Sequence, residues 1–153
     1  MIPVSVLLLF LAAQFFPKNR TNPAGEVGAD LFAVAEVPVE IRQILERSCY
    51  DCHSNETRWP WYSNVAPAGQ WLAHHVEEAR HHLNFSNWEK IAEHRRAKLM
   101  KEMSEEVAAG HMPLHSYLWL HGGARLSEQE RAFFVNWCDT RRAELEEELD
   151  EPR

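Results

Sequence analysis

The sequence has little cysteine, little glycine and no excess of positive charge. Its 153 residues include three Cys and six Gly, and 16 Lys and Arg stand against 23 Asp and Glu, for a net charge of −7. The first 20 residues hold two of the basic residues and no acid, so the rest carries 14 basic and 23 acidic residues, a net −9. This balance argues against a basic surface that binds nucleic acid and fits an acidic domain that meets a basic partner.

Several functional signatures are also missing. The chain contains no phosphate-binding glycine loop, no Ser-His-Asp order and no pair of carboxylates in an apolar setting. Its length is sufficient for one compact domain and is short for two domains. Six Trp residues are many for a chain of this size, and they would suit either an ordinary core or the walls around a large flat cofactor.

Two of the three cysteines belong to one short motif, Cys49-Tyr50-Asp51-Cys52-His53. Two thiols three residues apart, followed directly by an imidazole, are typical of covalent attachment of a c-type haem. One helical turn presents Cys49 and Cys52 on the same side, where each thiol can add to one vinyl group of the porphyrin. His53 then lies beneath the iron and donates a ring nitrogen as the proximal ligand. The motif predicts one covalently bound haem c.

A cysteine pair with this spacing has two other interpretations. A Cys-x-x-Cys pair can be half of a zinc site, but that site would need two more ligands, for example Cys138 and another His, and no second Cys-x-x-Cys exists. A thioredoxin-like dithiol requires a preceding strand and a βαβ pattern. Cys138 falls in a helical apolar pattern, which predicts a buried, inert thiol. The motif therefore favours haem.

The longest apolar run lies at residues 1–17, which carry no charge. This run predicts a membrane-targeting segment, either a signal peptide or a signal anchor. About 15 apolar residues are fewer than the roughly 20 of a full span. The sequence Ala12-Ala13-Gln14 matches a small-x-small cleavage site poorly, so an uncleaved N-terminal anchor is favoured. Export suits the haem interpretation, since c-type haem is attached outside the cytoplasm.

The remainder of the chain predicts an all-α domain. Residues 18–37 show no sustained period and are interpreted as a linker or an extended wrap, and the haem-binding domain spans 38–153. Apolar spacing and capping signals predict four main helices, over 38–48, over 69–83, from the Ser86-Asn87-Trp88-Glu89 capping box to Gly110, and from the Ser127–Glu130 capping box to about 147. We expect these helices to wrap around one haem as in cytochromes c, with 38–48 packed against 128–147.

A second axial ligand is predicted in the loop after the third of these helices. Met112 precedes Pro113 in that loop, 59 residues after His53. A lone Met usually fills a core, but a Met-Pro step just after a helix that stops at Gly favours a ligand. The Met112 thioether is predicted to bind iron on the face opposite His53.

Three large rings lie in the loop that follows the motif, namely Trp59, Trp61 and Tyr62. Such side chains are expected either to wall the haem and reach its propionates through N–H or O–H groups, or to plug the core beneath the loop. The sequence supports the two interpretations equally.

The motifs together resemble the c-type haem-binding domain proteins of bacterial envelopes, within the wider cytochrome c class. The similarity covers most of the chain and takes in CYDCHSNETRWPWYSNVAP at 49–67, HLNFSNW at 82–88, MPLHSY at 112–117 and ARLSEQE at 124–130. The resemblance implies haem at Cys49 and Cys52, proximal His53 and Met112 as the distal ligand.

The predicted function is that of a mono-haem c-type cytochrome that carries electrons through a His/Met-ligated haem and is not an enzyme. The expected location is the periplasmic side of the bacterial inner membrane, held by the N-terminal segment, or the soluble periplasm if that segment is cleaved. The expected partner is a redox protein of the periplasm or inner membrane. The alternatives are a peroxidase or gas sensor with a labile distal ligand, using His111 or His115 as acid or base, and a bis-His electron carrier.

Overall fold

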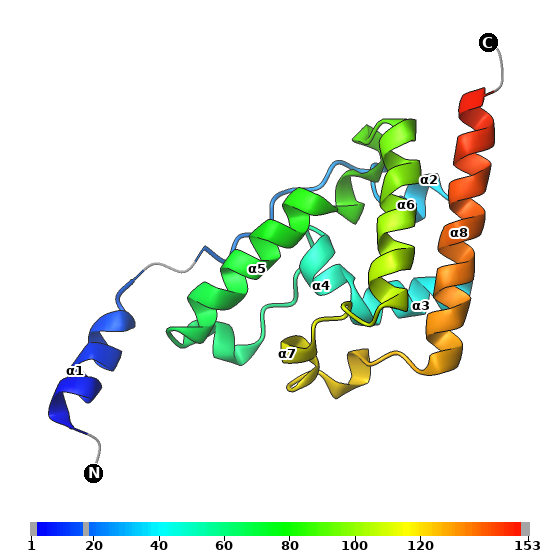
Figure 1. The fold of residues 1–153 in the computed structure, drawn as a ribbon. Helices are drawn as coiled ribbons and strands as arrows, with labels where there is room; N and C mark the ends of the chain where they lie inside the picture. Colours follow the sequence, from blue (N-terminus) through cyan, green and yellow to red (C-terminus); the bar gives the residue numbers. More distant parts are fainter. Residues whose placement is uncertain (1–2, 17–18, 151–153) are drawn as a thin grey trace.

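The structure is a computed structural model that describes residues 3–16 and 19–150, and within these residues it is all helical (Figure 1). The predicted all-α fold class is thereby confirmed. Its α-helices are α1 (Val4–Ala13), α2 (Leu31–Val34), α3 (Val39–Ser48), α4 (Tyr50–His53), α5 (Ala68–His82), α6 (Glu93–Ala108), α7 (His115–Leu118) and α8 (Glu128–Asp150). Short 3-10 helices add η1 (Trp61–Asn64), η2 (Phe85–Lys90) and η3 (Gly122–Ala124).

The core lies where α6 and α8 run side by side in opposite directions, with α3 packed across the start of α8 (Figure 1). Each of these helices contributes one apolar stripe, because buried positions recur at helical spacing. The buried stripe of α3 is Ile41, Ile44, Leu45 and Ser48. The contact between α3 and α8 confirms that the helices at 38–48 and 128–147 pack together.

The capping box predicted at the start of α8 is confirmed. The backbone N–H of Ser127 donates to Oε2 of Glu130 at 2.8 Å, and the N–H of Glu130 donates to Oγ of Ser127 at 3.2 Å. This reciprocal pair satisfies two N–H groups that the helix itself leaves free. The predicted stop at Gly110 is also found, because α6 ends at Ala108 and Gly110 adopts φ +75°, a left-handed conformation that favours glycine.

The capping box predicted at Ser86–Glu89 is wrong. Oγ of Ser86 accepts the N–H of Asn55, and the N–H of Glu89 donates to the carbonyl of Ala29. With both groups engaged by other segments, the chain forms η2 with a kink at Asn87, and α6 begins only at Glu93. Tertiary hydrogen bonds therefore override a local capping signal.

The N-terminal part reaches the domain as an extended strap. Residues 19–26 have no regular structure and run beside α5 (Figure 1). At their end Asp30 caps α2 by accepting the N–H of Phe32 at 2.9 Å. Preceding the strap, α1 is a ten-residue apolar helix with no buried residue. Within the described residues, no helix is both long and apolar enough to cross a membrane.

Candidate functional site

A largely apolar cavity of about 720 Å³ lies between α5 on one side and α6 on the other. Its volume is within the range of about 300–1,000 Å³ that cofactor sites occupy. The apolar lining comes from the core stripes and includes Ile44, Leu83, Phe85, Leu99, Val107 and Phe134. The same cavity is lined by four residues that the sequence predicted as haem contacts, namely Cys49, Cys52, His53 and Met112.

The motif lies at a break between two helices. Cys49 has φ −127° and ψ −42°, so it ends α3, and the single turn of α4 follows it. The carbonyl of Cys49 accepts the N–H of Cys52 at 3.1 Å and the N–H of His53 at 2.9 Å. This turn directs both thiols and the imidazole into the same cavity, and both cysteines are free thiols.

His53 is oriented by the backbone of α5. Its Nδ1 lies 3.1 Å from the carbonyl oxygen of Leu83 and 3.2 Å from that of Ala79. Carbonyl oxygens only accept, so Nδ1 carries the proton and Nε2 keeps a free lone pair. Burial lowers the pKa of His53, and the two carbonyls oppose that effect only in part. A neutral imidazole with one ring nitrogen fixed by a carbonyl is the usual arrangement of a metal-binding His.

Burial controls the chemistry of the two thiols as well. It raises the pKa of Cys49 to about 12, with a further rise from the nearby Cys52. It raises the pKa of Cys52 to about 11, where the Asp51 carboxylate adds to the effect. Both groups are therefore thiols at neutral pH. In this protonated form they are poor nucleophiles and poor metal ligands, because thiolate is the reactive form.

Met112 is held on the opposite side by the end of α6. The N–H of His111 and the N–H of Met112 donate to the carbonyl of Glu106 at 3.0 and 3.2 Å. The side chain of Arg131 on α8 donates to the carbonyl of Val107 and so satisfies the same helix end. These bonds fold the chain back under α6, and Met112 lines the cavity as a half-buried side chain.

Behind the motif lies a stack of aromatic rings. Tyr50 is sandwiched between Phe32, at 4.7 Å between centroids, and Phe85, at 5.0 Å. Phe85 continues edge-on to the ring of His53 at 6.2 Å. The Tyr50 hydroxyl donates to Asp30 at 3.0 Å, which anchors the stack to the start of α2. The stack packs against the motif and reaches the cavity through Phe85.

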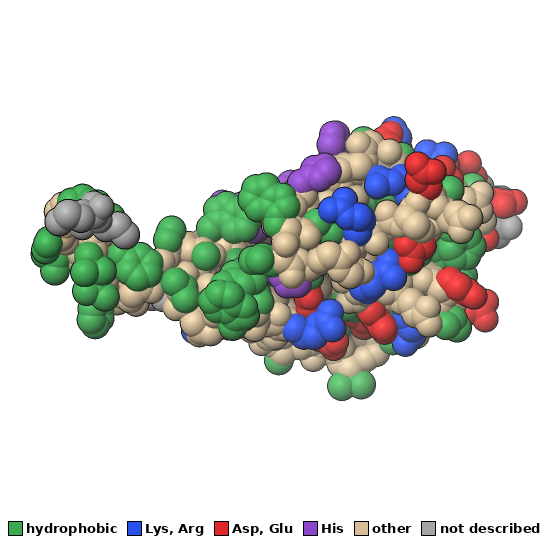
Figure 2. Space-filling model, turned by 90° about the horizontal axis from the view of Figure 1, so that it is seen from below, with side chains coloured by type: hydrophobic (Ala, Val, Ile, Leu, Met, Phe, Trp, Pro, Cys, Tyr) green, Lys and Arg blue, Asp and Glu red, His purple; other side chains and the backbone are tan. Residues whose placement is uncertain are grey.

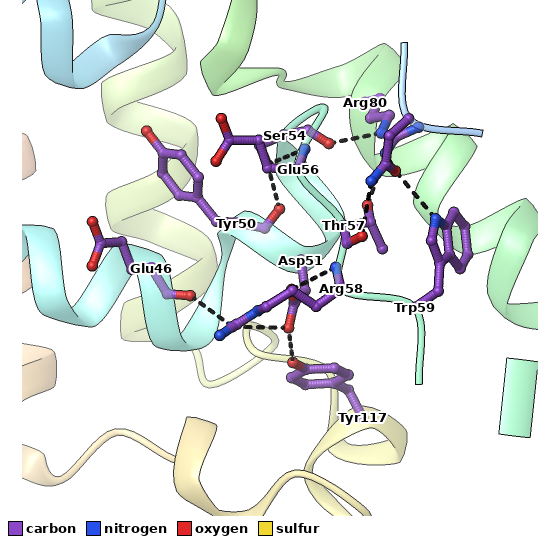
Figure 3. A network of polar contacts seen from close by, with 11 residues as sticks. Glu46, Tyr50, Asp51, Ser54, Glu56, Thr57, Arg58, Trp59, Arg80 and Tyr117 are labelled. Carbon is purple, nitrogen blue, oxygen red and sulfur yellow. Dashed lines mark hydrogen bonds and ion pairs between the residues drawn. The ribbon is translucent and has the colours of Figure 1, made fainter. Parts of the chain in front are cut away.

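A polar network holds the other side of the motif and the loop after it (Figure 3). Asp51 accepts the Tyr117 hydroxyl at 3.0 Å and pairs with Arg58 at 3.0 Å. Burial raises the pKa of Tyr117, as does the Asp51 carboxylate, so the hydroxyl keeps its proton. Arg80 of α5 donates to the carbonyl of Ser54 at 2.8 Å. The network ties α4, the loop, α5 and α7 together at the cavity edge.

The three rings of the following loop are not among the residues that line the cavity. Nε1 of Trp59 donates to Asn22 at 3.1 Å, and this indole lines a separate, more polar pocket beside α5. Trp61 is 77% exposed, and Tyr62 packs edge-on against His121 at 6.0 Å. Their predicted role as haem walls remains a prediction, which the described geometry does not favour.

Charged and imidazole groups lie at the edge of the cavity, and sequence reasoning gave no signal for most of them. They are His75, Glu78 and His82 of α5 and Arg95, Lys98, Glu102 and Glu106 of α6. The predicted alternative acid–base residues His111 and His115 are not in the lining. Nδ1 of His111 instead pairs with Glu106 at 3.2 Å on the surface.

The donor set and the cavity fit a haem. An apolar space of suitable volume presents a free imidazole nitrogen on one wall, a thioether on the other and two thiols at its edge. The chain was then compared with known protein families, and the model described as a haem-binding domain matches residues 8–140. The chain belongs to this haem-binding domain family. No match was found among curated proteins or among solved structures.

Family membership identifies the chain as a haem-binding protein. The zinc alternative required two further ligands beside the cysteine pair. Across residues 3–16 and 19–150, no group of three or more His, Cys, Asp or Glu side chains is placed to hold a metal ion. Cys138 is fully buried in the core, where burial raises the pKa of its thiol. Its position matches the predicted inert thiol.

Proposed function

We propose that this haem-binding protein is a mono-haem c-type cytochrome that carries electrons in the bacterial envelope. One observation carries the proposal: Cys49, Cys52, His53 and Met112 line the same cavity, with His53 held by the carbonyls of Ala79 and Leu83 and Met112 held at the end of α6. Haem iron, when bound, supplies one-electron chemistry between the ferric and ferrous states. Ligation by Met and His raises the reduction potential of such an iron above that of a bis-His iron.

Each residue has a distinct role in this proposal. Cys49 and Cys52 would hold a haem covalently, each sulfur bonding to one vinyl carbon while its thiol hydrogen would pass to the other carbon of that vinyl group. His53 binds the iron through Nε2 and keeps its proton on Nδ1 against the carbonyls of α5. The carbonyl bonds fix the ring plane and increase the basicity of the ligand.

The placement of α5 favours Met112 over a histidine as the distal ligand. His53 rests directly on the backbone of α5, so α5 forms the proximal wall. His75 and His82 also line the cavity, but both belong to α5 and so lie on the proximal side. On the α6 side, the sulfur ligands available are Met112 and Met103.

An electron carrier is favoured over an enzyme or gas sensor because both axial positions are then filled by the chain itself. Little rearranges when such a site changes its charge. A peroxidase would need Met112 to detach and an acid–base group to act beside the iron, and the two histidines predicted for that role, His111 and His115, are absent from the described lining. The envelope location and a redox partner there follow from the c-type attachment and from the apolar N-terminal segment.

The test is an absorption spectrum of the protein expressed with a c-type maturation system, before and after reduction by dithionite. Met112→Ala is compared with Met103→Ala, a matched control that removes the other thioether lining the cavity. A sharp reduced α-band and a weak far-red ferric band of sulfur ligation are expected in the wild type. The far-red band should disappear in Met112→Ala and persist in Met103→Ala.

Carbon monoxide provides a second readout on the same samples. The ferrous wild type should bind it slowly, whereas Met112→Ala should bind it rapidly and stoichiometrically. Loss of the far-red band in Met103→Ala alone would assign the distal position to Met103. Rapid binding by the wild type would favour a gas-binding function, and a colourless product would refute the proposal.

A further inference from the structure

The apolar helix α1 has no partner within the described chain. Only Ser5 is polar in its ten residues, and none of the ten is buried. A helix that is apolar on every side is normally surrounded by protein or by hydrocarbon. At 1.5 Å per residue it is about 15 Å long, roughly half of the hydrocarbon thickness of a bilayer. The described helix is therefore long enough to reach into one leaflet.

The end of α1 is fixed to the domain through a side-chain amide. Nε2 of Gln14 donates to the carbonyl of Ala66 at 3.3 Å, and Oε1 of Gln14 accepts the N–H of Ala66 at 2.9 Å. A little further along the strap, Arg20 donates to the hydroxyl of Ser63 at 3.3 Å and also to the side chain of Asn64. The helix is therefore attached at the segment that joins η1 to α5.

Exposed apolar side chains of the type found at membrane interfaces lie in η1, in this segment and in α5. Trp61 is 77% exposed, Trp71 is 48% exposed and Val65 is 37% exposed. We call these three residues the aromatic face. Tryptophan concentrates at the level of lipid headgroups because its ring is apolar and its N–H is polar. Rings that belonged to the core of the domain would be buried, and these are not.

Apolar and charged side chains lie at opposite ends of the surface seen in Figure 2. In Figure 2 the half of the molecule next to α1 is dominated by hydrophobic side chains, and the Lys, Arg, Asp and Glu side chains gather on the far half. A highly charged protein partner would bind to the charged side chains of the far half. The end near α1 instead matches a hydrocarbon and headgroup environment.

We propose that the aromatic face, together with α1, is a lipid-binding surface that holds the haem domain in one orientation on a bilayer. The inference rests on the proposed envelope location and not on the identity of the iron ligands. α1 enters the hydrocarbon, the clamp at Gln14 prevents free rotation about the strap, and Trp61 and Trp71 lie at the headgroup level. The domain is then attached to the bilayer at two points rather than by a single tether.

The test uses the full-length, haem-loaded protein with vesicles and supported bilayers of neutral phosphatidylcholine. Retention on vesicles is measured by flotation and scored both by haem absorbance and by the protein band. Orientation is measured as the linear dichroism of the haem absorption on the supported bilayer. The double variant Trp61→Ser/Trp71→Ser is compared with Phe133→Ser, which removes an exposed ring from α8 at the charged end.

The wild type and Phe133→Ser should float with the vesicles and show clear haem dichroism. The double variant should dissociate from the vesicles several-fold faster, so that less of it floats. It should also lose most of the haem dichroism. Gln14→Ala, which leaves every ring in place, should also lose dichroism while it still floats. Unchanged retention and dichroism in the double variant would overturn the proposal and leave the aromatic face to a protein partner. A colourless protein that still floats would refute the proposed function alone.

Discussion

Arg80 is the residue whose loss should most clearly reveal what holds the loop after the motif. Its guanidinium donates to the carbonyl of Ser54 at 2.8 Å and to the hydroxyl of Thr57 at 2.8 Å. It also donates to the carbonyl of Thr21 at 2.9 Å and to the side chain of Asn22 at 3.0 Å. One side chain on α5 therefore joins the loop to the N-terminal strap.

The loss of stability in an Arg80 variant depends on which of these four acceptors can form a hydrogen bond with water instead. Ser54 is 0% exposed and Thr57 is 6% exposed, so Arg80→Met leaves two buried acceptors without this donor. Each buried group left unpaired costs about 1–3 kcal/mol. Thr21 and Asn22 are exposed and are rehydrated at little cost. We therefore expect Arg80→Met to lower the free energy of unfolding by about 2–6 kcal/mol.

The matched control is Arg58→Met, which removes an equally long side chain from the same network. Arg58 is bidentate to Asp51, but its side chain is 72% exposed, so the loss should be within about 1 kcal/mol. Urea unfolding of the haem-loaded protein, followed by far-UV circular dichroism, measures both values. If the two variants lose the same stability, or if Arg80→Met loses less than Arg58→Met, burial of the acceptors is not what makes Arg80 important.

Two further predictions concern charge. The pKa of Glu130 is lowered from its usual 4.5, first by the N–H of Ser127 and then by Arg47, so its stabilisation is present above about pH 4.5 and lost as the pH falls through the lower folded-state pKa. Glu130→Gln should therefore flatten the decline in urea stability below pH 4.5, and an unchanged decline would contradict this assignment. Lys98→Gln, which removes a cation from the cavity edge, should lower the reduction potential by about 20–40 mV because a nearby cation disfavours the ferric state. Lys101→Gln, one turn further along α6 and outside the lining, should leave the potential measured by redox titration unchanged, and equal shifts would refute the local effect.

Features of the chain that depend on local patterns were well predicted from sequence. The helix at α3 follows from its apolar spacing, and the start of α8 follows from a capping box whose two residues bond to each other as the local pattern predicts. The predicted loop at Met112 is also found, because Gly110 ends α6 in the left-handed conformation that only a few residues adopt readily. These signals need no knowledge of distant segments.

Features that depend on contacts between distant segments were missed. The capping signal at Ser86 failed because Asn55 and Ala29, both far away in sequence, engage the groups of the box. The short helix α2 and the role of Asp30 as partner of Tyr50 had no periodic pattern to reveal them. The rings after the motif were recognised as unusual, but their direction depends on strap contacts such as that between Trp59 and Asn22.

A Cys-x-x-Cys-His motif accepts any residue at its two middle positions, yet in this chain both middle residues make specific contacts. Tyr50 fills a slot between two rings and donates to Asp30, and Asp51 accepts from Tyr117 and pairs with Arg58. Replacing the middle dipeptide by that of another Cys-x-x-Cys-His motif would keep both thiols and the imidazole and still remove the contacts that orient them. A graft of this site therefore has to move the five-residue turn together with the residues that contact Tyr50 and Asp51. The middle positions vary between such motifs, but within this chain they are constrained by their contacts.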